Sequence, residues 1–199
     1  MILRFRKAFD DEIDDLLETP EDLEWFLWGE EPDEPFEGSS LLSNILNLLV
    51  NERYKRKSLH EKPWKKPALS DECDIDKAWQ AIHYILTETV NSGYYPRSFL
   101  LLGGDQIGTI DLGYGPARAF KSDQVKEIYD MLISFNTKRA RKFLNLEGLT
   151  SYSIYVYNNL KPEQMDEDEK THIFSHFERM KHFIETLSDE NAGMIIYYT

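Results

Sequence analysis

The sequence predicts an α+β fold in which a small, mostly antiparallel sheet packs against several helices. Apolar residues recur with the 3.6-residue period of a helix in several segments, and short strand-like segments stand near both ends of the chain. No regular strand–helix–strand spacing and no internal repeat connects these segments. With 199 residues, 41% of them apolar, the chain is long enough to bury a core, and we expect one domain over residues 1–199.

The N-terminal region is expected to begin with a strand and two acidic helices. Residues 1–6 include alternating apolar and basic side chains, which favours a half-buried strand. Thr19 and Pro20 have the cap and first-turn positions of the second helix, and residues 30–38, with two prolines, predict a loop. The apolar stripes of the two helices consist of Phe9, Ile13, Leu16 and Leu17 in the first and Leu23, Phe26 and Leu27 in the second.

The central region is expected to alternate between helices and loops. Ser40 caps an apolar helix that extends toward Tyr54, and residues 53–66 form a basic loop with seven Lys or Arg residues. Asp74 is the expected N-cap of a helix over residues 75–87. The apolar stripe of that helix is the most regular in the chain and consists of Ile75, Ala78, Trp79, Ile82, Ile85 and Leu86.

The C-terminal half is expected to hold three strands and three helices. Residues 98–102 are an apolar run that ends at two glycines, which is typical of a buried strand, and Ser122 caps a helix that ends near Phe135. The other elements are a short basic helix over 137–146, a strand over 151–157, a long helix over 163–188 and a last strand over 193–198. The apolar stripe of the long helix consists of Ile173, Phe177, Met180, Ile184 and Leu187.

Two stretches carry a resemblance to a known family. Residues 74–87 read DIDKAWQAIHYILT, and residues 113–118 read GYGPAR and lead into the helix over 122–135. By these stretches, their order and their spacing, the sequence resembles the YfbM-like bacterial proteins, a domain of unknown function. The resemblance implies an intracellular α+β domain and carries no established reaction. It also implies a link to toxin systems, because related proteins are found among their candidate immunity partners.

The resemblance divides the expected domain into two parts. Residues 74–199 are the family-like part, whereas residues 1–73 are a divergent acidic helical part that includes the basic loop over 53–66. The segment over 38–69 is longer than is typical of the family.

Charge is concentrated in one segment of the chain. The net charge is −13, and residues 10–37 hold 14 acidic residues without a single Lys or Arg. An acidic protein repels phosphate, so we expect no nucleic-acid partner. A local negative field instead steers encounter with a basic protein. The chain shows no membrane span and no signal peptide, and its single cysteine, Cys73, excludes an internal disulfide, so we expect a cytoplasmic protein.

One helix offers a candidate ligand site. Asp76, Trp79 or Gln80, and His83 follow one edge of the helix over 75–87. A carboxylate and an imidazole on one face can act as acid and base or hold a polar ligand. The structural alternative is a buried His83 satisfied within the chain and an Asp76 that caps or pairs. The expected lining of the site is Asp76, Lys77, Trp79, His83, Tyr114 and Arg118.

Other motifs argue against cofactor, metal or nucleophilic chemistry. The stretch over 113–118 has Arg118 where a dinucleotide fingerprint has its third glycine, and we expect that arginine to pair with a carboxylate. His172 and His176 have the helical spacing of two metal ligands, but no Glu follows His172 as in zinc proteases. Acidic neighbours raise the pKa of Cys73. We therefore expect no cofactor, no metal and no catalytic set.

The leading functional prediction is a non-enzymatic, protein-binding protein, in particular an immunity-type inhibitor of a toxin with a basic surface. The alternative is a small-molecule binding protein or enzyme with a pocket around Trp79, His83 and Arg118. The sequence does not predict the oligomeric state. The candidate partner-binding residues, acids with interleaved aromatic anchors, are Glu21, Glu24, Trp25, Trp28, Glu30 and Glu31.

Overall fold

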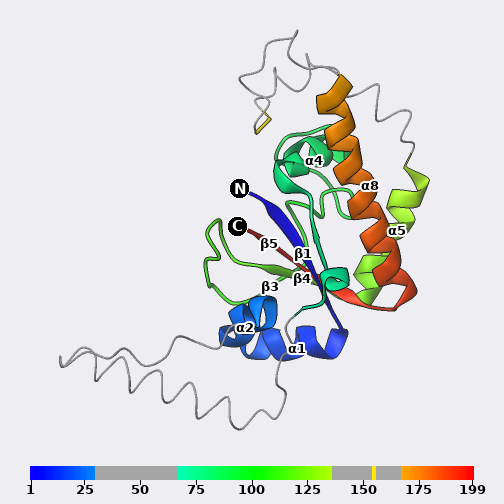
Figure 1. Ribbon diagram of the computed structural model, residues 1–199. Helices are drawn as coiled ribbons and strands as arrows, with labels where there is room; N and C mark the ends of the chain where they lie inside the picture. The colour runs from blue at the N-terminus through cyan, green and yellow to red at the C-terminus, as the bar shows by residue number, and fades with distance from the viewer. Residues whose placement is uncertain (30–66, 136–153, 156–166) are drawn as a thin grey trace, which may run out of the picture. The chain divides into compact units, whose positions relative to one another are not determined.

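In the described part of the chain, five strands form one sheet in the order β2-β1-β5-β4-β3, with every neighbouring pair antiparallel (Figure 1). The strands are β1 (Leu3–Ala8), β2 (Glu72–Asp74), β3 (Asp105–Gln106), β4 (Arg118–Phe120) and β5 (Gly193–Tyr198). The central strand β5 is a continuous apolar run because both of its faces are buried. The predicted α+β class with a mainly antiparallel sheet is thus confirmed.

The computed structural model describes residues 1–29, 67–135, 154–155 and 167–199. Contacts separate two compact units within the chain, Met1–Glu21 with Leu69–Thr199, and Asp22–Ala68. The predicted helices over 41–54 and 137–146, the basic loop over 53–66 and most of the predicted strand over 151–157 lie outside the described residues. The division of the chain at residue 73 stays a prediction.

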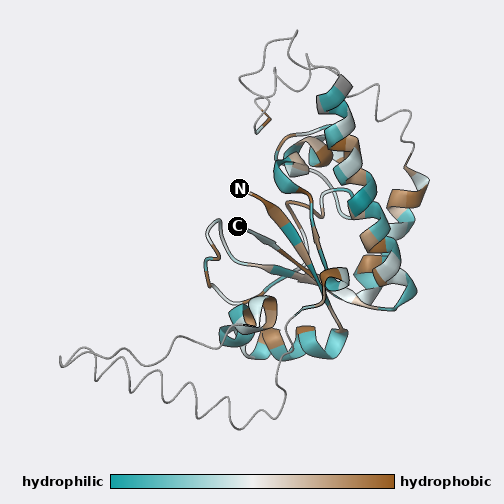
Figure 2. Cartoon of the chain, viewed as in Figure 1, coloured by the Kyte–Doolittle hydropathy of each residue, from teal (hydrophilic) through white to brown (hydrophobic). Residues whose placement is uncertain are grey.

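The larger unit has its main core between the sheet and three helices, α4 (Trp79–Thr87), α5 (Ser122–Ser134) and α8 (Glu167–Asp189). Helix α8 runs beside α5 (Figure 1) and also packs on β2 and α4. Its predicted stripe is buried at all five positions, and the hydropathy colouring of α8 alternates accordingly (Figure 2). None of the described helices has both the length and the apolar character of a membrane span.

Helix α1 (Asp10–Glu18) belongs to the same unit and buries Ile13 and Leu16. Its packing explains a glycine at the start of β5. A Cβ atom on Gly193 would lie 2.6 Å from Ile13 Cδ1 and 2.5 Å from the backbone oxygen of Phe120. Only glycine allows α1 and the neighbouring strand to approach this closely.

The smaller unit contributes helix α2 (Leu23–Trp28) to the described residues. Leu23, Phe26 and Leu27 are buried, as the apolar spacing predicts. The helix ends at Gly29, which has the left-handed conformation common after a helix C-terminus.

The predicted buried strand over residues 98–102 is wrong. The segment forms successive turns, in which the Ser98 oxygen accepts hydrogen bonds from the backbone N–H groups of Leu101 (2.9 Å) and Leu102 (2.8 Å). Phe99 and Leu100 are both fully buried. A run of apolar residues indicates only that the segment is buried, and a buried segment can be a strand or a packed turn.

Two predicted helix caps are also corrected. Asp74 ends strand β2 opposite Arg4, and a 3-10 turn, η3 (Asp76–Ala78), precedes α4. Asp76 has a left-handed backbone (φ 46°), so one continuous helix cannot run from Ile75. Ser122 is the first residue of α5 rather than its cap.

The cap of α5 comes instead from α1. The Asp10 carboxylate accepts hydrogen bonds from the Ser122 N–H (2.8 Å) and hydroxyl (2.7 Å). A carboxylate at a helix N-terminus satisfies a free N–H group and complements the helix dipole.

Candidate functional site

Helix α4 places Trp79 and His83 inside the protein. The Trp79 ring packs edge-on against Tyr198, with ring centroids 5.4 Å apart, and stacks on Tyr155. The His83 side chain is fully buried, and its Nε2 lies 3.0 Å from the Ser92 backbone oxygen. Burial lowers the pKa of His83, against the opposing effect of the Ser92 hydrogen bond. His83 is therefore a neutral imidazole at pH 7.

Arg118 holds the turn over residues 98–103. Its Nη1 donates to the oxygens of Phe99 (3.2 Å) and Gly103 (2.8 Å), and its Nη2 donates to the Leu100 oxygen (2.6 Å). The predicted carboxylate partner is wrong, because backbone carbonyls occupy the guanidinium. A turn that replaces a strand leaves carbonyls without a sheet partner, and a rigid fork of N–H donors satisfies several of them at once.

In the glycine loop before β4, the backbone N–H groups donate to a carboxylate of the same loop. The N–H groups of Gly113 (2.8 Å) and Gly115 (2.7 Å) both donate to Asp111 Oδ1. These hydrogen bonds lower the pKa of Asp111, with the Gly115 bond the larger cause. A phosphate would need the same N–H groups.

The two family-like motifs are connected indirectly, through Tyr198 and the Leu100 oxygen. Trp79 lies against Tyr198, whose hydroxyl donates to the Leu100 oxygen (2.9 Å), and Arg118 donates to that same oxygen. Of the other predicted site residues, Lys77 is exposed and Tyr114 is 55% exposed. A ligand site lined by all six residues stays a prediction.

The sixth predicted residue, Asp76, lies near two histidines of α8. The carboxylate of Asp76 and ring nitrogens of His172 and His176 all lie within 4.8 Å of one another. Sequence reasoning noted the helical spacing of the two histidines, but it had no signal that η3 packs against this turn of α8. Only the fold brings the third group to them.

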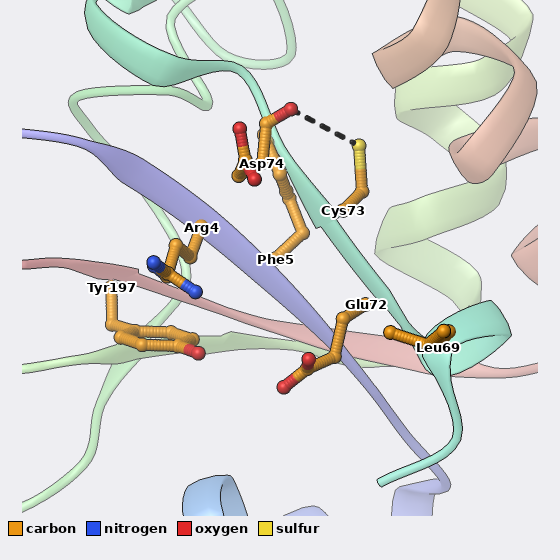
Figure 3. Close-up of a pocket in the computed structure, with 7 residues that line it drawn as sticks. All are labelled: Arg4, Phe5, Leu69, Glu72, Cys73, Asp74 and Tyr197. Carbon is orange, nitrogen blue, oxygen red and sulfur yellow. Dashed lines mark hydrogen bonds between the residues drawn. The ribbon is translucent and has the colours of Figure 1, made fainter.

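A hollow of about 240 Å³ lies at the β2 edge of the sheet (Figure 3). Arg4 lies beside Tyr197 there, and Glu72 and Asp74 add two carboxylates. Burial raises the pKa of Tyr197 to about 12. None of the six predicted ligand residues lines this hollow, and its volume is below the usual range for small-molecule sites, about 300–1,000 Å³. Its lining consists of Arg4, Phe5, Leu69, Glu72, Cys73, Asp74 and Tyr197.

Cys73 offers no reactive thiol. Its side chain is buried, and its Sγ lies 3.8 Å from the Asp74 backbone oxygen (Figure 3). Burial raises the pKa of the thiol to about 12, although Arg179 acts in the opposite direction. A thiol with this pKa is protonated at pH 7 and is a poor nucleophile.

The candidate partner-binding residues fall in both units. Glu21 ends the first segment of the larger unit and is partly exposed. In α2, Glu24 is exposed, whereas Trp25 and Trp28 are half-buried. The remaining two candidates, Glu30 and Glu31, lie outside the described residues.

The fold defines a class of protein, namely an α+β protein with a five-stranded antiparallel sheet in its described part. A family model described as "Domain of unknown function (DUF1877)" matches residues 1–197, and the chain belongs to this family. The YfbM-like resemblance is confirmed by a solved structure described as a protein of unknown function, YfbM, from Escherichia coli.

That structure covers 98% of this chain and 98% of its own, with a TM-score of 0.58 and 17% sequence identity. At this identity the likeness shows a shared fold. No curated protein matches the chain.

Proposed function

We propose that this protein binds a basic protein partner through its acidic segment over residues 10–37, as an immunity-type inhibitor of a toxin with a basic surface would. The supporting observation is the charge distribution. The segment holds 14 acidic residues and no Lys or Arg, whereas the rest of the chain has a net charge close to zero. A field of this kind speeds encounter with an oppositely charged surface. The proposal places the protein in the cytoplasm.

Some acidic residues of helix α1 make contacts that stabilise the fold, and several are exposed. Asp10 caps α5, Asp14 Oδ1 lies 2.6 Å from Lys121 Nζ, and Glu12 accepts a hydrogen bond from the Phe9 N–H (2.8 Å). Asp11, Asp15 and Glu18 are exposed. The carboxylates of these three residues therefore contribute negative charge at the surface of the helix.

Helix α2, in the smaller unit, has its own combination of acidic and aromatic surface. Trp25 and Trp28 are one turn apart and half-buried, and Glu24 beside them is exposed. Half-exposed tryptophans are frequent anchors in protein interfaces, because a large apolar ring gains most from complete desolvation.

The alternative pocket around Trp79, His83 and Arg118 has less support. His83 is fully buried, and the Arg118 guanidinium already donates to three backbone oxygens. A ligand at these residues would have to replace interactions that stabilise the fold.

A charge-neutralised variant tests the proposal. In Glu18→Gln/Glu21→Gln/Glu24→Gln, three acids of the segment lose their charge. The matched control, Asp130→Asn/Glu178→Gln/Asp189→Asn, removes the charge of three exposed acidic residues in α5 and α8. Tagged wild type and both variants would be used to capture proteins from the native cell extract at low and moderate salt, with quantification by mass spectrometry.

We expect a basic protein that wild type and control capture equally and that the segment variant captures less, with capture falling as salt rises. Equal capture by the segment variant and the wild type would refute the proposal. So would a partner whose capture does not depend on salt.

A further inference from the structure

Three side chains from distant parts of the chain bring metal-binding atoms together. A carboxylate oxygen of Asp76 and one ring nitrogen each of His172 and His176 lie within 4.8 Å of one another. The two imidazole rings are nearly perpendicular, with centroids 4.4 Å apart. Among the residues that the structure describes, this is the one group of three or more such side chains with this proximity.

The backbone explains how the group forms. His172 and His176 are four residues apart in α8 and therefore project from one face of the helix. The 3-10 turn η3 packs against α8. Within that turn Asp76 has a left-handed backbone conformation (φ 46°), which aspartate tolerates better than most residues.

His176 gives a second indication of a bound ligand, independent of the distances within the cluster. The residue is only 6% exposed, and its Nδ1 is buried without a hydrogen-bond partner. Buried polar atoms usually have a partner, so an unsatisfied imidazole needs an explanation. His83 Nδ1 is also unpartnered, but no cluster of ligand groups among the described residues includes His83.

Charged groups around His176 act on its ring in opposite directions. Burial is the main cause that lowers its pKa, and His172 and Arg179 add to the effect, while Asp76 and Asp74 oppose it. Asp74 and Asp76 favour a cation here and Arg179 disfavours one.

We propose that Asp76, His172 and His176 form a binding site for a divalent transition-metal ion, with Zn²⁺ as the best-matched probe. Two imidazole nitrogens and one carboxylate suit Zn²⁺, Co²⁺ or Fe²⁺, whereas Mg²⁺ and Ca²⁺ prefer oxygen ligands alone. Ligand atoms around tetrahedral zinc lie about 3.3 Å apart, so small side-chain rotations close the site. Three protein ligands leave one coordination position open, as catalytic zinc sites do.

The proposal departs from the expectation of no metal, which rested on the missing Glu after His172 and on the position of His176 in the apolar arc of the helix. The third ligand comes from η3 instead of from α8. The inference does not depend on the proposed protein partner.

The first experiment uses the full chain after chelator treatment and gel filtration. Co²⁺ is added with visible absorption as the readout, and Zn²⁺ is titrated by calorimetry. We expect a single equivalent of Zn²⁺ to bind and to displace Co²⁺ together with its visible bands. Mg²⁺ and Ca²⁺ in excess should leave the bands unchanged. Absence of Zn²⁺ binding, or equal competition by Mg²⁺, would overturn the proposal.

Variants then locate the ion. Asp76→Asn keeps a residue that tolerates the left-handed backbone and removes the charge, and His172→Gln changes an exposed position. The control is His182→Gln, because His182 is an exposed histidine of the same helix outside the cluster. Loss of even an outer-sphere partner costs about 10–100-fold in metal affinity, so each ligand variant should bind Zn²⁺ at least about tenfold more weakly.

His182→Gln should bind Zn²⁺ like the wild type. Wild-type affinity in both Asp76→Asn and His172→Gln would show that the ion binds elsewhere, for example on the acidic segment, and would refute the assignment. Circular dichroism of each variant confirms that it is folded, and His176→Ala is avoided because His176 is buried.

Discussion

Two polar regions of the molecule resemble ligand sites, and they differ in where their hydrogen bonds go. In the region over residues 98–118, the Arg118 guanidinium donates to backbone oxygens, and Asp111 accepts the N–H groups of the glycine loop. In the cluster of Asp76, His172 and His176, a buried imidazole nitrogen has no partner.

Residue types alone therefore do not identify a ligand site. An arginine beside a Gly-x-Gly loop suggests an anion site by composition, yet both features here are satisfied within the chain. Binding energy for an external ligand remains where polar atoms lack partners in the folded state, because the ligand then restores a lost interaction. Variants in the two regions should therefore behave in opposite ways.

The largest effect is expected at Arg118, in the internally satisfied region. Arg118→Met removes the donors for the oxygens of Phe99, Leu100 and Gly103. Since bonds to charged donors contribute about 1.5–3 kcal/mol each and water replaces part of them, we expect the free energy of unfolding to fall by about 2–4 kcal/mol. Urea unfolding at pH 7 measures this change.

Lys126→Met, an exposed substitution on α5, is the matched control and should lie within about 0.5 kcal/mol of wild type. Zn²⁺ affinity of folded Arg118→Met should be unchanged. If Arg118→Met were as stable as the wild type but lost Zn²⁺ binding, Arg118 would belong to a ligand site and would not stabilise the fold.

The sequence predicted the elements whose patterns are long and one-sided. The stripe of α8 and the strands β1 and β5 are found, because a repeated period over several turns or an apolar strand shows which face is buried. The stripe of α1 is found in part, since Ile13 and Leu16 are buried but Phe9 is 43% exposed. Strand β4 (Arg118–Phe120) was missed, since three residues are too few to show a period.

The sequence was less informative about the polar residues. Whether Arg118 meets a carboxylate or a set of carbonyls depends on the turn over residues 98–103, which an apolar run does not reveal. The spacing of His172 and His176 was visible, but their approach to Asp76 depends on packing between η3 and α8. Long-range contacts of this kind have no local pattern in one sequence.

A smaller effect is expected at His83, which has one satisfied nitrogen. His83→Leu removes one of two donors to the Ser92 oxygen, which also accepts a hydrogen bond from the Thr89 hydroxyl. The free energy of unfolding at pH 7 should therefore fall by about 1 kcal/mol, the net contribution of one hydrogen bond. Because burial lowers the pKa of His83 in the folded state, the unfolded chain binds a proton more readily. The stabilising contribution is complete above the ordinary pKa of histidine and is lost as pH falls below it toward the folded-state pKa.

Urea unfolding of metal-free protein from pH 7 to pH 5 measures this dependence. The His83→Leu variant should show a shallower loss of stability than the wild type, with the remaining slope shared by His176, whose pKa is also lowered. An identical slope in both proteins would mean that His83 is not held neutral by burial. Zn²⁺ affinity of His83→Leu should equal that of the wild type, because His83 is not part of the cluster.

The smallest effect is expected at Asp111, where the interaction is exposed and local. The N–H bonds of Gly115 and Gly113 lower the pKa of this carboxylate, so its contribution to stability is present above the unfolded-state pKa and is lost as pH falls through the folded-state pKa. A carboxyl-carbon NMR titration should therefore give a midpoint below that of an unstructured aspartate. In Asp111→Ala, amide exchange at Gly113 and Gly115 should accelerate while global unfolding barely changes. If both amides exchanged as slowly as in the wild type, the hydrogen bonds to Asp111 would not be what protects them, and this loop would not be the internally satisfied site that the comparison assigns to it.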